Sequence, residues 1–165
     1  MSSAADVPVW PVEGPVQAEV FVLRMHAGVP ELAGPCGPEP WYLEVAQDED
    51  PVEVVKRLTT NLLGAPLLVH STSWRRARGG VILSFIVVIG DDQARQLPGV
   101  PIGRAELARA AATEAPRNIA ATQVIEHGLR HLSWLARDDA VVQSVLDDRW
   151  KEVLAGYVPE PFQHL

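Results

Sequence analysis

The sequence predicts an α/β fold, a sandwich in which a mixed sheet has a helix on one side and C-terminal helices on the other side or at an end. One observation is a set of apolar, β-branched stretches that resemble strands, at residues 18–24, 41–45, 67–74 and 81–89. The others are a well-marked helix at residues 51–63 and the helical periodicity of the last third of the chain. Strands interleaved with helices favour a sheet covered by helices.

The helix expected at residues 51–63 has the clearest boundaries. Asp50 is a good N-cap, Pro51 suits the first helical position, and Glu53 follows the cap at capping-box spacing. Gly64 ends the helix where a left-handed residue is usual. The periodicity predicts one apolar face, made by Val52, Val55, Leu58 (or Thr59) and Leu62.

The rest of the first two thirds divides into loops and one strong hairpin. Residues 1–16 are expected to form an irregular arm, and the Gly- and Pro-rich residues 25–40 a long loop. Residues 81–89 are apolar throughout, so this strand is expected to be covered on both faces. We expect it to pair with residues 67–74 across a turn at 75–80 and to be followed by a loop at 90–103.

Residues 104–155 are expected to form C-terminal helices. The pattern predicts one helix at 104–113, a second from a cap at Asn118, and a last one from a cap at Asp138 or Asp139 to about Ala155. These helices are interpreted as an added cap on the sandwich or as the face of a homodimer.

Composition narrows the class of protein. A length of 165 residues suits one domain, and the net charge of -7 argues against non-specific nucleic-acid binding. The single cysteine, Cys36, excludes an internal disulfide framework and is compatible with a reducing compartment. The N-terminus does not resemble a signal peptide, and the longest apolar run, residues 81–89, is too short to span a bilayer. We expect a cytoplasmic protein that does not bind membranes.

Residues 43–65 resemble the box of the Nudix hydrolase family. That box has a Gly, five residues, a Glu, seven residues, then Arg-Glu-apolar, any residue, Glu-Glu, any residue and Gly-apolar. With its closing Gly placed on Gly64, Arg57 and Glu49 take the positions of its Arg and its first Glu. Leu43 replaces the opening Gly, and the positions of the three helix carboxylates are occupied by Leu58, Asn61 and Leu62. The segment resembles a degenerate Nudix box.

The resemblance covers roughly residues 18–90 and implies the family's α-β-α sandwich. It also implies hydrolysis of diphosphate bonds with Mg²⁺, which takes oxygen ligands and lowers the pKa of the attacking water. Leu and Asn cannot replace ionised carboxylates, so the resemblance supports the fold more strongly than catalysis. If activity is retained, the candidates are Glu49, Glu53 and Arg57 for catalysis and Asp48, Glu49 and Glu53 for the metal.

A simpler interpretation of the acidic turn is that Asp50 and Glu53 cap the helix while Glu44, Asp48 and Glu49 are solvated near its positive end. His127 and His131, beside Glu126, lie one turn apart on one helix face; they suit a metal less well than interhelix packing or a solvated face. Because neighbouring strand residues point to opposite faces, His70 and Ser71 are not expected to form a hydrolytic pair.

A phosphorylated ligand has a second set of candidate contacts. Arginine pairs bidentately with phosphate oxygens, and the turn expected after Trp74 carries several arginines. Trp74 is a candidate for stacking on a base. The ligand-binding candidates are Trp41, Glu44, Trp74, Arg75 and Arg76, with Arg78 in the same turn. The alternative is a solvated, charged turn.

Three functions follow from the sequence. The first is a catalytically degenerate Nudix-like module that binds a nucleotide, another phosphorylated ligand or a partner protein. The second is an active, Mg²⁺-dependent hydrolase of nucleoside-diphosphate compounds. The third is a homodimeric structural or interaction protein. Fold alone cannot choose among them.

Overall fold

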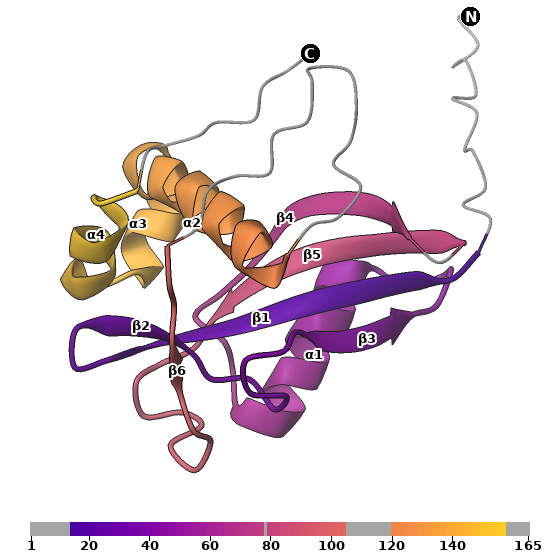
Figure 1. The fold of residues 1–165 in the computed structure, drawn as a ribbon, viewed down its shortest axis with the longest axis horizontal. Helices are drawn as coiled ribbons and strands as arrows, with labels where there is room; N and C mark the ends of the chain where they lie inside the picture. Colours follow the sequence, from indigo (N-terminus) through magenta and orange to yellow (C-terminus); the bar gives the residue numbers. More distant parts are fainter. Residues whose placement is uncertain (1–13, 78, 105–119, 158–165) are drawn as a thin grey trace, which may run out of the picture.

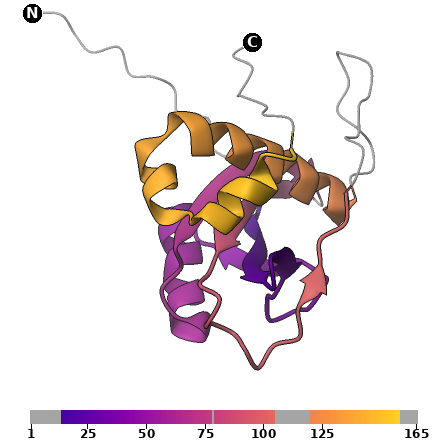
Figure 2. The ribbon, with the colours of Figure 1, turned by 90° about the vertical axis from the view of Figure 1, so that its left-hand side faces the viewer.

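The computed structural model describes residues 14–77, 79–104 and 120–157. The strands are β1 (Val16–His26), β2 (Val29–Leu32), β3 (Trp41–Val45), β4 (Leu68–Ala77), β5 (Gly80–Val88) and β6 (Val100–Pro101). The helices are α1 (Pro51–Leu63), α2 (Ala121–Asp138), α3 (Ala140–Val145) and α4 (Asp148–Leu154). The strands form one mixed sheet, with α1 on one face and α2, α3 and α4 on the other (Figures 1 and 2). The predicted α/β class with a mixed sheet is confirmed.

Strand β1 lies at the centre of this sheet. The order is β4-β5-β1-β2-β6, and β3 pairs with the first half of β1 on the side where β2 pairs with its second half. Strands β1 and β5 run parallel, from the Val16–Val81 pair to the Leu23–Val88 pair. Their carboxyl ends therefore meet at one edge of the sheet.

Alternate residues of the central strands face two separate apolar cores. Phe21 and Leu23 of β1 pack with Ile86 of β5 under α2, α3 and α4. Val20 and Val22 of β1 lie in the core beneath α1. Because both faces are covered, β1 and β5 need apolar residues at consecutive positions.

The long loop predicted at residues 25–40 is wrong in its first part, where β1 continues to His26 and β2 follows at Val29–Leu32. The two strands form a hairpin around Ala27 and Gly28, which have φ angles of 48° and 77°. Two-residue hairpin turns of this kind normally carry Asn, Asp or Gly at both central positions. Alanine at the first position conceals the turn signal.

The turn predicted at residues 75–80 is also wrong in its first half, because β4 continues to Ala77 and pairs Arg75 with Ile82. The strand has an irregular register between Ser71 and Ser73. The prediction ended the strand at its arginines, but Arg75 continues the ladder because its side chain is paired with the buried carboxylate of Glu19.

Helix α1 begins as predicted, since the Asp50 side chain accepts hydrogen bonds from the backbone N–H groups of Val52 (2.8 Å) and Glu53 (3.4 Å). Gly64 follows the helix with a φ of 91°. The predicted apolar face is wrong by part of a turn: Val52 and Leu62 are 39% and 52% exposed. The buried side chains are Val54, Val55, Thr59 and Leu63.

The C-terminal helices differ from the prediction in their boundaries. Residues 105–119 lie outside the described residues. They include the predicted cap at Asn118 and all of the helix predicted at 104–113 except Arg104. Helix α2 begins at Ala121. Asp139 caps α3 as expected. The predicted continuous last helix is wrong, because the Asp147 side chain accepts from the N–H of Trp150 and starts α4 as a separate helix.

Gly128 allows α2 to lie close to the sheet. An added Cβ would overlap Cδ1 of Ile86 and approach Cγ2 of Thr72 to 3.1 Å. Overpacking typically destabilises a protein by about 1–3 kcal/mol. The better helix propensity of alanine over glycine stabilises a helix by only about 1 kcal/mol. We expect Gly128→Ala to lower the free energy of unfolding, measured by urea denaturation, despite its better helix propensity. Asn61→Ala on the exposed side of α1 is the control; a more stable Gly128→Ala would show that this contact is not tight.

Candidate ligand pocket

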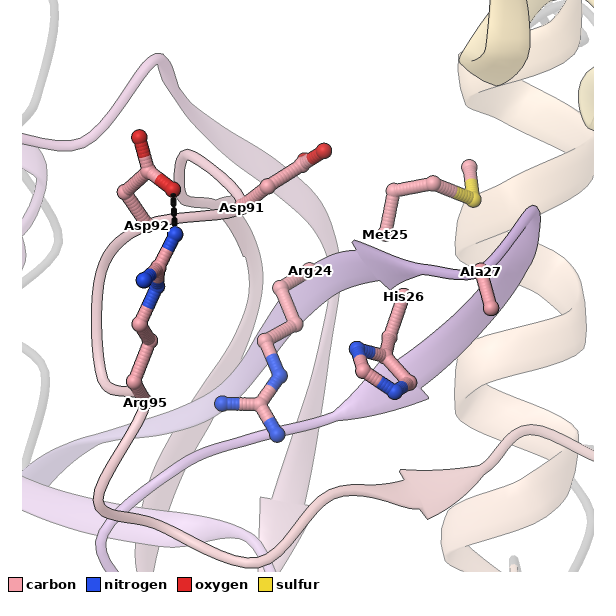
Figure 3. Close-up of a pocket in the computed structure, with 7 residues that line it drawn as sticks. All are labelled: Arg24, Met25, His26, Ala27, Asp91, Asp92 and Arg95. Atoms are coloured by element: carbon pink, nitrogen blue, oxygen red, sulfur yellow. Dashed lines mark hydrogen bonds and ion pairs between the residues drawn. The ribbon is translucent and has the colours of Figure 1, made fainter.

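A pocket of about 480 Å³ opens at the edge of the sheet where parallel strands β1 and β5 end (Figure 3). It lies between the end of β1, the β1–β2 turn and the segment that follows β5. In open α/β sheets, ligands bind outside the carboxyl ends of the strands. Its lining residues are Arg24, Met25, His26, Ala27, Asp91, Asp92 and Arg95.

Arg24 fixes the segment after β5 to the sheet. Its Nη1 donates to the carbonyl oxygen of Ala94 (2.6 Å) and its Nη2 to that of Leu97 (3.1 Å). Its charge is balanced by Glu31, whose Oε2 lies 3.3 Å from Nη2, and both side chains are nearly buried. Gly99 lies against this pair so closely that a Cβ would overlap Oε2 of Glu31. These contacts fix the segment after β5 against Arg24 on one side of the pocket.

Two strained residues flank the pocket. In the described part of the chain, the residues other than glycine with positive φ are Ala27 (48°) and Ala94 (55°). Ala27 lines the pocket, and Ala94 accepts the hydrogen bond from Arg24. Residues held in sparsely populated backbone conformations cluster at functional sites, so this feature favours the pocket as the functional site.

The charged groups of the rim are already paired. Asp92 forms an ion pair with Arg95, and the two side chains are 85% and 74% exposed. Asp91 is paired with Arg149 of α4. In the view of Figure 3, both carboxylates lie above the guanidinium groups of Arg24 and Arg95. An exposed ion pair contributes only about 0–1 kcal/mol, so a ligand that separates Asp92 from Arg95 incurs a cost of at most about 1 kcal/mol.

A second polar cluster crosses four strands on the face that carries α2. Glu19 of β1, only 2% exposed, accepts from Arg75 of β4 through both oxygens (2.7 and 2.8 Å) and from Ser84 of β5 (2.8 Å). Tyr42 of β3 also donates to Glu19, at 3.1 Å. Burial raises the pKa of Glu19, but the hydrogen bonds from Arg75 and Ser84 outweigh it and lower the pKa. The carboxylate stays ionised and ties the strands together.

The predicted ligand-binding residues are not brought together. Arg75 points to the face of Glu19, whereas Trp74 and Trp41 align with Leu83 and Val20, which belong to the core on the α1 face. Glu44 and Arg76 are both exposed, and Arg78 lies outside the described residues. None of these residues lines the pocket. Because β4 continues to Ala77, Trp74 and Arg75 are consecutive residues of one strand. Their side chains therefore point to opposite faces of the sheet.

The acidic turn lies near the start of β1, at the opposite end of the sheet from the pocket, since Val45 pairs with Val16. The structure brings together the two residues that match the Nudix box: Arg57 Nη2 lies 3.0 Å from Glu49 Oε1. Hydrogen bonding to Arg57 lowers the pKa of Glu49. Asp48 and Glu53 are exposed. Within the described residues, no group of three or more His, Cys, Asp or Glu side chains is placed to hold a metal ion.

His70 and His131 form a pair between β4 and α2. Nε2 of His70 lies 2.9 Å from Nδ1 of His131, and the His131 ring stacks on Trp134. Glu126 is bound by Arg104 and Arg130. Ser71 is exposed, and its neighbour His70 pairs across the sheet with Ile86, whose side chain belongs to the core under α2. His131 is buried and contacts His70 of the sheet, so it lies between a helix and the sheet, whereas the sequence predicted packing between two helices or a solvated face.

The sequence alone does not reveal the pocket. Arg24 falls within a predicted strand, and residues 90–103 form a predicted loop in which no residue type stands out. A Gly-Asp-Asp sequence at residues 90–92 follows the most apolar strand. The position of these two acids directly after a buried strand is the feature of the sequence that could have indicated the pocket.

No protein-family model matches this chain, and no curated protein matches its sequence. The described helices include none long and apolar enough to cross a membrane. Large exposed apolar side chains are spread over several elements (Tyr42, Val52, Leu62, Trp74 and Val141 among them). The described C-terminal helices contribute only Val141 to this set. The expected homodimer stays a prediction.

We expect Arg24→Met to reduce the free energy of unfolding by about 3–5 kcal/mol, because it leaves the Glu31 carboxylate buried and unpaired. The double variant Arg24→Met, Glu31→Leu is expected to recover most of that loss. Urea denaturation of the two variants and of wild type measures both effects. A double variant no more stable than the single one would show that the carbonyl contacts of Arg24, and not the buried charge, dominate.

The His70–His131 pair predicts a pH dependence. Burial, and then the charge of His131, lower the pKa of His70 to about 4 from an ordinary value of 6.5. Between pH 6.5 and pH 4, His70 binds a proton in the unfolded chain but not in the folded protein. The free energy of unfolding therefore falls as the pH drops from 6.5 to 4, and His70 causes no further change below pH 4. The loss amounts to at most about 3 kcal/mol. His70→Phe is expected to flatten the stability curve over this window; an unchanged slope would contradict the assignment.

Proposed function

We propose that this protein is a Nudix-like module that binds a small phosphorylated ligand, such as a nucleotide, without hydrolysing it. The observation that carries the proposal is the pocket at the carboxyl ends of β1 and β5, which is lined by both Arg24 and Arg95 (Figure 3). Arginine recognises phosphate through charge-assisted, often bidentate hydrogen bonds. A pocket of about 480 Å³ lies in the size range of small-molecule sites.

The two arginines have different roles in this proposal. Arg24 has a nearly buried side chain that is held by Glu31 and by two carbonyl groups, so it holds the wall of the pocket in place and leaves Arg95 to bind the phosphate. Arg95 is 74% exposed and bound only loosely to the rim through Asp92. Its guanidinium is able to leave Asp92 and take a phosphate.

Helix α1 lacks the carboxylates that hydrolysis of this kind needs. At the positions where the Nudix box carries helix carboxylates, α1 presents Leu58, Asn61 and Leu62, and the last two are exposed. Neither aliphatic nor amide side chains hold Mg²⁺ as ionised carboxylates do. The remaining acid of the box, Glu49, is engaged with Arg57. The box helix therefore supplies the scaffold without the metal chemistry.

A thermal-shift screen over nucleotides, sugar nucleotides and simple phosphate esters, each with and without Mg²⁺, tests the proposal. A ligand at about 100 times its dissociation constant adds roughly 2.7 kcal/mol, which raises the Tm of a domain of this size by roughly 5–10 °C. We expect such a rise without Mg²⁺, no product formation, and loss of the rise in Arg95→Ala. Arg137→Ala, an exposed arginine at the end of α2, is the matched control.

Two outcomes would contradict this function. A rise and turnover that both require Mg²⁺ would establish the hydrolase instead. No rise with any phosphorylated compound would leave the interaction protein as the best remaining function.

A further inference from the structure

The ion pair of Asp92 and Arg95 determines what kind of ligand fits the pocket. Both side chains line the pocket and both are mostly exposed, so their charges balance each other at the rim. A ligand anion that takes Arg95 must separate this pair. The Asp92 carboxylate is then left without its partner and beside a like charge, which opposes binding.

The other charges of the pocket do not relieve Asp92. Arg24 is committed to Glu31 and to two backbone carbonyls of the segment after β5. Arg149 of α4 is shared between Asp91 and Asp147. Two aspartates and two arginines line the cavity, so a purely anionic ligand meets as many carboxylates as guanidinium groups.

A ligand with one anionic and one cationic group avoids this penalty. Its anion pairs with Arg95 and its cation pairs with Asp92, so each charge of the separated pair is compensated again. Figure 3 shows Asp92 and Arg95 in direct contact at the rim of the pocket, so the two charges that such a ligand would take lie side by side. Specificity then arises from the cost that a purely anionic competitor incurs.

We infer that the ligand of this pocket is a zwitterionic phosphate, a phosphate ester that carries an ammonium group near the phosphate. Arg95 is the residue that binds the phosphate, and Asp92 is the residue that selects the amine. This inference rests on the proposed function and adds to it the class of phosphorylated compound that the pocket prefers.

Two probes that differ in one group test the inference, namely 2-aminoethyl phosphate and ethyl phosphate, titrated into the full chain by calorimetry without Mg²⁺. Because the Asp92 side chain is mostly exposed, its pairing with the ammonium group is expected to make the amino compound bind up to about fivefold more tightly. In Asp92→Asn the preference is expected to disappear, while ethyl phosphate binds at least as tightly as to wild type. Glu39→Gln, an exposed acid before β3, is the control and is expected to keep the preference.

The outcomes separate the inference from the function on which it rests. Equal binding of the two probes to wild type, or a preference that persists in Asp92→Asn, overturns the inference and leaves a phosphate-binding module in place. Binding of nucleotides without binding of either small probe also overturns the inference and leaves that module in place. If no phosphorylated compound binds to wild type or to Asp92→Asn, both the inference and the proposed function fail.

Discussion

The covering of β1 on both faces is the constraint from which the rest of the structure follows. A strand that pairs in parallel with β5 and antiparallel with β2 and β3 has no edge exposed along most of its length. Its eight residues from Ala18 to Met25 are therefore all buried, including the charged residues Glu19 and Arg24. Burying a charge is costly unless it is paired and hydrogen-bonded, so each of these two residues gathers partners from distant parts of the chain.

The two buried charges organise opposite ends of the strand. Glu19 collects Tyr42, Arg75 and Ser84 near the start of β1 and joins four strands across one face. Arg24, near its carboxyl end, collects Glu31 and the carbonyl groups of the segment after β5. The partners of Glu19 are strand residues, whereas those of Arg24 include a loop that it holds against the end of the sheet. The pocket lies between that loop and the β1–β2 turn, which explains why it is found where the parallel strands end.

The fold class followed from local patterns that tertiary contacts did not override. The Asp50 cap, Gly64 and the apolar residues 81–89 have local physical causes, and the structure retains each of them. The sequence did not predict which face of α1 is buried. Residues 52–63 contain two overlapping apolar stripes, and only contact with the sheet selects between them. The break between α3 and α4 was similarly hidden, since Asp147 is compatible both with an exposed helix position and with a cap.

The sequence by itself determined most of the elements and their order, because capping, periodicity and residue chemistry are local properties. Only the tertiary structure decided which side chains meet. Trp74 and Arg75 are neighbours in sequence but point to opposite faces of β4. Arg24 and Asp91 are 67 residues apart in sequence yet line one pocket. The physical reason is that parallel pairing of β1 and β5 joins distant chain segments at one edge, and no pattern within either segment encodes that register.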